Sequence, residues 1–184
     1  MDERLKSKIS NHFKQCGNVE KLFMFEQIPH DKLFNATKSY AQNIIEQDEV
    51  VILLYDDTFF GSAKNGFVLT NKRLYSKNIL SEVNVADVSN IRDITVSGDL
   101  IVTTHHDSFN IQITQTVDDA GKRRLPKVVQ GIVNMLKSSK TYDSTATKDK
   151  ASKEIAKKFP RICKNCGAPL DPQTGVCEYC FTRY

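Results

Sequence analysis

The sequence predicts an α+β protein with N-terminal helices, a small antiparallel β-barrel capped by a helix, and a short metal-binding tail. Three observations carry this prediction. Apolar residues recur at helical spacing before residue 48, and about seven short strands follow at close intervals. Four cysteines then form two C-x-x-C pairs near the end of the 184 residues. The composition, 40% hydrophobic and 26% charged, is typical of globular proteins.

The first predicted region, residues 1–48, is helical. Its first apolar stripe recurs every four residues and consists of Leu5, Ile9 and Phe13. The pattern leaves the conformation of residues 22–28 open. A second helix begins near Pro29, and one side of it carries Leu33, Ala36, Tyr40 and Ile44. We expect a helical hairpin packed on the next domain, with a dimerisation or partner surface as the alternative.

The second predicted region, residues 49–138, is a barrel domain. Its seven predicted strands are 50–55, 67–70, 73–77, 81–85, 91–96, 100–104 and 109–113. The last strand is the clearest, because apolar and polar residues alternate strictly along it. The gaps are too short for helical crossovers, so an antiparallel meander or barrel is favoured over a parallel sheet.

A helix is expected after the last strand, with Pro126 in its first turn. It would cap the open end of the barrel with an apolar stripe made of Val128, Val129, Ile132, Val133 and Leu136. Residues 138–153 contain no Val, Ile, Leu, Met or Phe and cannot bury enough apolar surface to offset ordering. We therefore predict a flexible linker over 139–159.

The final region, residues 160–184, contains the one strong chemical motif. Two C-x-x-C pairs are separated by ten residues, and the four sulfur ligands are Cys163, Cys166, Cys177 and Cys180. Two such knuckles place four thiolates around one ion, which predicts a single structural Zn²⁺ with no open coordination position. The fifth cysteine, Cys16, makes the count odd and disfavours a set of disulfides.

The charge distribution argues against a large basic surface. In residues 1–139 the Lys and Arg equal the Asp and Glu in number, so the whole formal excess of +4 lies in residues 140–184. Phosphate recognition normally uses a clustered basic face. The sequence has no apolar segment of membrane-spanning length and no apolar core of a secretory signal near its start, so a cytoplasmic location is expected.

Other polar groups are interpreted without a catalytic role. Asp56 and Asp57 are expected to lie in a solvated loop. Cys16 is interpreted as a structural thiol, because no histidine or carboxylate is assigned to it. His105 and His106 are adjacent in a strand end, so they point to opposite faces and do not readily bind one metal. We therefore expect a protein that is not an enzyme.

Residues 54–78, and within them GFVLTNKRLY at 66–75, resemble bacterial PH-like domains of the GRAM and pleckstrin-homology superfold. The resemblance covers about residues 46–138 and implies a seven-stranded, strongly bent barrel with one C-terminal helix. Its lipid-binding members generally use basic residues around the first strand and the next loop. Here that region has two aspartates and one nearby cation, Lys64, which weighs against phosphoinositide recognition.

The tail, in turn, resembles the zinc ribbons of many bacterial regulatory and envelope-associated proteins. Phe181 stands where a glycine usually follows the second C-x-x-C pair, a departure that concerns the turn geometry and not the ligands.

These patterns together favour a non-enzymatic binding or adaptor module that docks a protein or peptide partner, with the ribbon as a second contact. Phe59 and Phe60 are the candidate anchor, either exposed on a long loop or buried under the N-terminal helices. One alternative is a nucleic-acid-binding regulator that uses the basic tail, with contacts from Lys157, Lys158, Arg161 and Lys164. Membrane-surface binding is less favoured, and a homo-oligomer through the N-terminal helices remains open.

Overall fold

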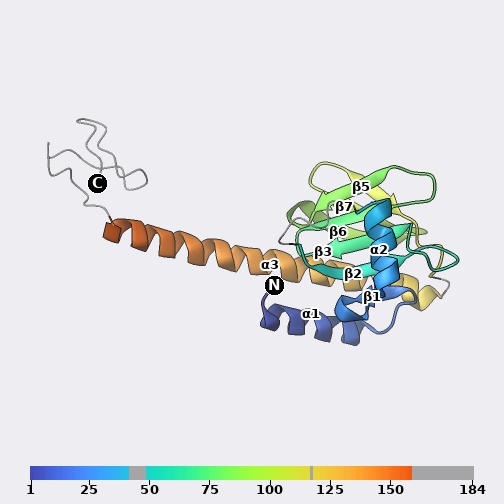
Figure 1. Ribbon diagram of the computed structural model, residues 1–184, viewed down its shortest axis with the longest axis horizontal. Coiled ribbons are helices and arrows are strands. Elements are labelled where there is room, and N and C mark those ends of the chain that lie inside the picture. The colour runs from blue at the N-terminus through green and yellow to red at the C-terminus, as the bar shows by residue number, and fades with distance from the viewer. Residues whose placement is uncertain (42–48, 117, 159–184) are drawn as a thin grey trace. The chain divides into compact units, whose positions relative to one another are not determined.

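The computed structural model describes residues 1–41, 49–116 and 118–158, with side chains as far as Ser139 (Figure 1). It confirms a mixed α+β architecture, with two antiparallel sheets and, within those residues, three α-helices. Residues 1–137 form one compact unit that contains both sheets.

The larger sheet has five strands in the order in which they occur along the chain. They are β1 (Leu22–Met24), β2 (Val51–Asp56), β3 (Gly66–Thr70), β4 (Arg73–Lys77) and β5 (Val83–Asp87). Every neighbouring pair is antiparallel. Five consecutive buried residues in each of β2 and β3 show that apolar groups cover both faces of the sheet centre.

The smaller sheet contains β6 (Ile91–Ser97), β7 (Asp99–Thr104) and β8 (Ser108–Ile111), again antiparallel. The seven predicted strands correspond to β2–β8, but they form two separate sheets and not one closed barrel. A single 3-10 turn, Val88–Asn90, lies between β5 and β6. This turn leads the chain from one sheet to the other, so β5 and β6 do not pair.

The N-terminal region differs from the predicted helical hairpin, because β1 lies between its two helices. Helix α1 (Glu3–Cys16) places Ile9 in the apolar cluster shared with both sheets and the C-terminal helix. Helix α2 (His30–Ser39) places Ala36 in a second cluster on the other face of the larger sheet. Leu53 and Leu54 of β2 belong to different clusters because successive strand residues point to opposite faces.

Helix α3 (Asp119–Lys158) covers the main core with the predicted apolar stripe, which is buried throughout. Pro126 lies inside this helix and not in its first turn, because the Asp118 side chain caps the earlier start by accepting a hydrogen bond from the backbone N–H of Gly121 at 2.6 Å. The helix continues through Lys158, where we expected a flexible linker. No glycine or proline interrupts residues 138–158, so the backbone has no local reason to leave the helix.

Gly66 is required by close packing at the start of β3. A Cβ there would lie 2.0 Å from the carbonyl oxygen of Tyr55, and its φ is +123°. We expect Gly66→Ala to lower the free energy of unfolding by about 3 kcal/mol, because backbone must move and a strained φ must be kept. Urea denaturation followed by circular dichroism measures this loss.

Gly98→Ala is the matched control. Gly98 also has a positive φ, +77°, but an added Cβ would meet no atom within 4 Å. The control should lose only about 1 kcal/mol of backbone strain. Equal losses in the two variants would show that close packing at Gly66 contributes nothing.

Candidate functional site: a fixed loop with two exposed phenylalanines

The β2–β3 loop, residues 57–65, carries the most exposed aromatic side chains of the described chain. Phe59 is 77% exposed and Phe60 is 93% exposed. Their rings contact each other edge to face, with centroids 5.1 Å apart. The sequence left open whether the two rings are exposed on the loop or buried under the N-terminal helices. In the structure they are exposed.

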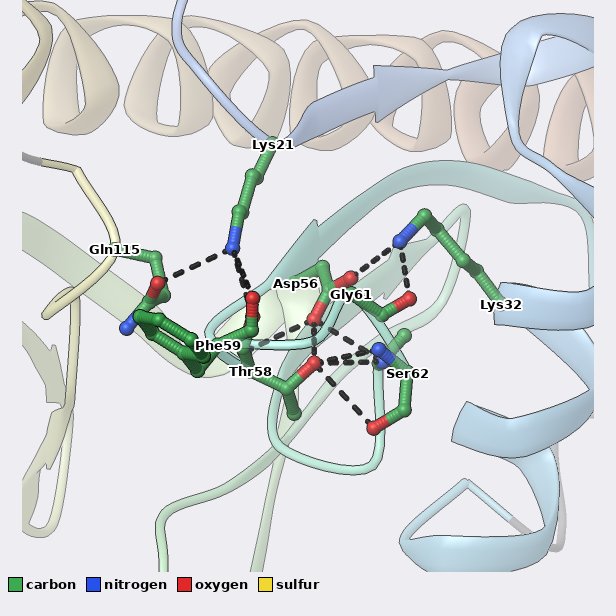
Figure 2. Close-up of polar contacts among 9 residues, drawn as sticks. Lys21, Lys32, Asp56, Thr58, Phe59, Gly61, Ser62 and Gln115 are labelled. Carbon is green, nitrogen blue, oxygen red and sulfur yellow. Dashed lines mark hydrogen bonds and ion pairs between the residues drawn. The ribbon is translucent and has the colours of Figure 1, made fainter.

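One carboxylate at the end of β2 organises this loop (Figure 2). Asp56 Oδ1 accepts hydrogen bonds from the backbone N–H of Thr58 at 2.9 Å and of Ala63 at 3.0 Å, and from the Thr58 hydroxyl at 2.5 Å. Thr58 Oγ1 in turn accepts a bond from the backbone N–H of Ser62 at 2.7 Å. The loop backbone therefore folds around a single oxygen atom.

Two lysines from the N-terminal region fix the loop from outside (Figure 2). Lys32 of α2 donates to Asp56 Oδ2 at 2.5 Å and to the carbonyl oxygen of Gly61. Lys21, just before β1, donates to the carbonyl of Thr58 at 2.7 Å and to Gln115 Oε1 at 3.1 Å. Both ammonium groups thus bind loop carbonyls and are engaged within the protein.

Asp57 ties the other side of the loop base to the segment that follows β8. Its Oδ1 accepts bonds from the backbone N–H of Gln115 at 3.0 Å, the hydroxyl of Thr114 at 3.1 Å and the hydroxyl of Tyr55 at 3.3 Å. Asp56 and Asp57 are both almost fully buried. The solvated loop expected from the sequence is therefore wrong, since each carboxylate exchanges water for several protein donors.

The pKa values of the two neighbouring carboxylates are shifted in opposite directions. Burial raises the pKa of Asp56, but the hydrogen bonds from Lys32 and Thr58 together outweigh burial and hold that pKa below its ordinary value. Burial also raises the pKa of Asp57, and there the uncharged donors do not compensate, so its pKa lies above the ordinary value. Asp56 is thus the carboxylate that the structure favours in its charged form.

This arrangement fits a contact surface. The exposed apolar part of the loop consists of two aromatic rings. The loop backbone that carries them already has the conformation that binding would otherwise have to order. Among the described residues there is no group of three or more His, Cys, Asp or Glu side chains placed to hold a metal ion. Also within those residues, none of the helices combines the length and apolar character that a membrane crossing requires.

The remaining predicted residues are distributed as follows. The four zinc-ligand cysteines, Cys163, Cys166, Cys177 and Cys180, lie outside the described residues, as do Arg161 and Lys164. Lys157 and Lys158 end helix α3.

Cys16 does have a histidine neighbour, because His12 Nε2 of the same helix lies 3.6 Å from its sulfur. That nitrogen also contacts the carbonyl of Lys127, so the imidazole joins α1 to α3.

Comparison with known proteins adds no relative. No family model, curated protein or solved structure matches this chain.

No local pattern in the sequence indicates the residues that hold the loop. Lys32 is 24 positions from Asp56, and Gln115 is 94 positions from Lys21. The β2–β3 loop itself has a local cue, since an aspartate two residues before a threonine often closes a side chain–backbone turn.

We expect Asp56→Asn to lower the free energy of unfolding at pH 7 by about 3 kcal/mol, because it leaves the mostly buried Lys32 ammonium without its counter-charge. The folded pKa of Asp56 lies below its ordinary value of 3.8. Its contribution is therefore present above about pH 4 and is lost as the pH falls through the folded pKa. Urea titrations at several pH values should show the difference between Asp56→Asn and the unmodified protein shrinking below about pH 4.

Asp87→Asn is the control, since Asp87 forms an exposed ion pair with Arg73 at 3.3 Å. It should change stability by less than about 0.5 kcal/mol. A loss in Asp56→Asn as small as in this control would contradict the organising role of Asp56.

Proposed function

We propose that this chain is a non-enzymatic binding module. Its body, the compact unit of residues 1–137, binds a protein or peptide partner through the β2–β3 loop. One observation carries the proposal: Phe59 and Phe60 are largely exposed on a backbone that Asp56, Lys21 and Lys32 hold in place. A folded protein gains no stability from aromatic rings in water, whereas a partner pocket does gain from burying them.

The energetics favour an anchor of this kind. Full burial of a phenylalanine side chain contributes about 1.5–3 kcal/mol, and interface energy concentrates in a few buried aromatic residues. Because internal hydrogen bonds already order the loop, little conformational entropy is lost when it binds.

The strand arrangement supports the proposal that the body is a PH-like domain. Strands β2–β5 supply four antiparallel strands, β6–β8 supply three in a second sheet, and α3 follows them. Seven antiparallel strands followed by a helix are what the resemblance implies, although here the strands form two separate sheets and β1 adds an eighth strand to the larger one. Since this superfold serves many roles, the proposed function rests on the loop and not on the fold.

The cysteine spacing supports a second proposal, that residues 160–184 form a zinc ribbon and supply a second contact with the partner. Four thiolates are a donor set that suits Zn²⁺, and the metal would supply most of the folding free energy of so short a segment. Binding through two connected contacts raises the effective concentration of the second one.

The zinc proposal predicts one Zn²⁺ per chain. Native mass spectrometry with metal analysis should find it in the purified full chain and lose it after chelation. Cys166→Ser should reduce the bound zinc by at least tenfold, because it removes one of four ligands. Cys16→Ser changes a thiol outside the motif and should retain one zinc, and a metal-free protein in the unsubstituted chain would contradict the proposal.

The docking proposal predicts that a photoreactive amino acid at position 60 crosslinks one specific partner in the cells that make this protein. With that partner purified, the double variant Phe59→Ser/Phe60→Ser should bind at least 100-fold more weakly, because two anchors are lost. Its stability should change by less than about 0.5 kcal/mol, since both rings are exposed.

Phe34→Ser is the matched control, because Phe34 is also an exposed phenylalanine but lies on α2. It should leave the partner affinity unchanged. Crosslinking to nucleic acid from the C-terminal residues, with an affinity that falls steeply with salt, would instead favour the alternative through Lys157, Lys158, Arg161 and Lys164.

A further inference from the structure

We propose that the β4–β5 loop, residues 78–82, is the second half of the docking surface, and that both loops insert into an apolar groove of a protein partner. This inference rests on the proposed function and adds to it a second loop and the chemistry of the partner. The residues of the second loop that would enter the groove are Ile79 and Leu80.

Strand pairing places the two loops side by side. Gly66, which follows the β2–β3 loop, pairs with Lys77, which precedes the β4–β5 loop. Paired strands lie about 4.8 Å apart, so the bases of the loops are neighbours. Figure 1 shows both loops projecting from the same end of the larger sheet.

The same segment of chain holds both loops. Gln112 accepts a hydrogen bond from the backbone N–H of Ile79 at 3.1 Å, and its own N–H donates to Asn78 Oδ1 at 2.9 Å. Three residues later, Gln115 donates to Asp57 and accepts from Lys21 in the β2–β3 loop system. The positions of the two loops are therefore fixed to a common support after β8.

Leu80 supplies an independent observation. It is 102% exposed, and its φ of +58° lies in the left-handed region, which is unfavourable for a residue with a branched side chain. Glycine or asparagine would fit that backbone with less strain. A strained and fully exposed leucine brings no benefit to the folded chain alone, whereas contact with a partner explains it.

The charges of the two loops select the partner. Their exposed charged side chains are Lys64 and Glu82, which cancel. Of the flanking cations, Lys21 and Lys32 bind loop carbonyls and Asp56, and Lys77 donates a hydrogen bond to Ser39. Anionic membranes and nucleic acids attract clusters of several basic residues, which these loops lack. An apolar groove of a protein, in contrast, suits projecting uncharged side chains.

The size of the surface agrees with this role. Phe59, Phe60, Ile79 and Leu80 each expose more than half of their area. At 150–250 Å² for a large aromatic side chain and somewhat less for the aliphatic ones, the two neighbouring loops together expose roughly 500 Å² of apolar side chain, an area comparable to that of the largest apolar patches on monomers.

The test places a photoreactive amino acid at position 60, 80 or 50 of the full chain in the cells that make it. Val50 is the matched control, because it is an exposed apolar residue beside Asn71, at the other end of the β2–β3 pair. We expect positions 60 and 80 to crosslink the same protein and position 50 not to do so. Crosslinking from position 60 alone would overturn this inference and leave the proposed function intact, whereas no crosslinking from either would overturn both.

The crosslinked protein, once purified, gives the deciding measurement. Leu80→Asn should weaken its binding at least tenfold while raising the urea midpoint of the free chain, because asparagine tolerates the positive φ. Unchanged affinity would overturn the inference. Crosslinks from both loops to lipid, with sedimentation on phosphatidylserine vesicles, or to a second copy of this chain would overturn the assignment of a protein groove.

Discussion

The carboxylate of Asp56 is the interaction on which the candidate site depends. One oxygen binds the backbone of the β2–β3 loop, and the other binds Lys32 of α2. A charged group buried at the end of a strand is costly unless all of its acceptor sites are used, and here the loop itself supplies the donors. The same contacts that stabilise the carboxylate therefore keep Phe59 and Phe60 out of the core.

Asp57 completes this support from the opposite side of the sheet. Adjacent residues at a strand end point in opposite directions, so Asp56 meets α2, whereas Asp57 meets Thr114 and Gln115 after β8. The loop is thus held by elements that come early and late in the chain. Such a loop keeps its conformation only when both sheets and α2 are folded, which makes its order a property of the whole unit.

The sequence predicted the parts that periodicity controls. Strands β2–β8 and the buried stripe of α3 follow from spacing alone, because burial imposes periods of two and of 3.6 residues. It did not predict β1, whose three residues are too short to show alternation and are strands only because β2 pairs with them. The burial of Asp56 and the exposure of Phe59 depend on Lys32, a residue distant in sequence, so no local pattern indicates them.

Strand β1 also has a consequence for how the chain reaches and keeps its fold. It occupies the edge of β2, a strand with five consecutive buried residues. The unpaired backbone groups of an uncovered strand edge can pair with another chain, so residues 22–24 protect against aggregation by covering the edge of β2. They precede β2 in the chain, so they are already synthesised and available to pair when β2 emerges from the ribosome. Removal of residues 1–24 would leave β2 with an unpaired edge that favours pairing with another chain, rather than a smaller working domain.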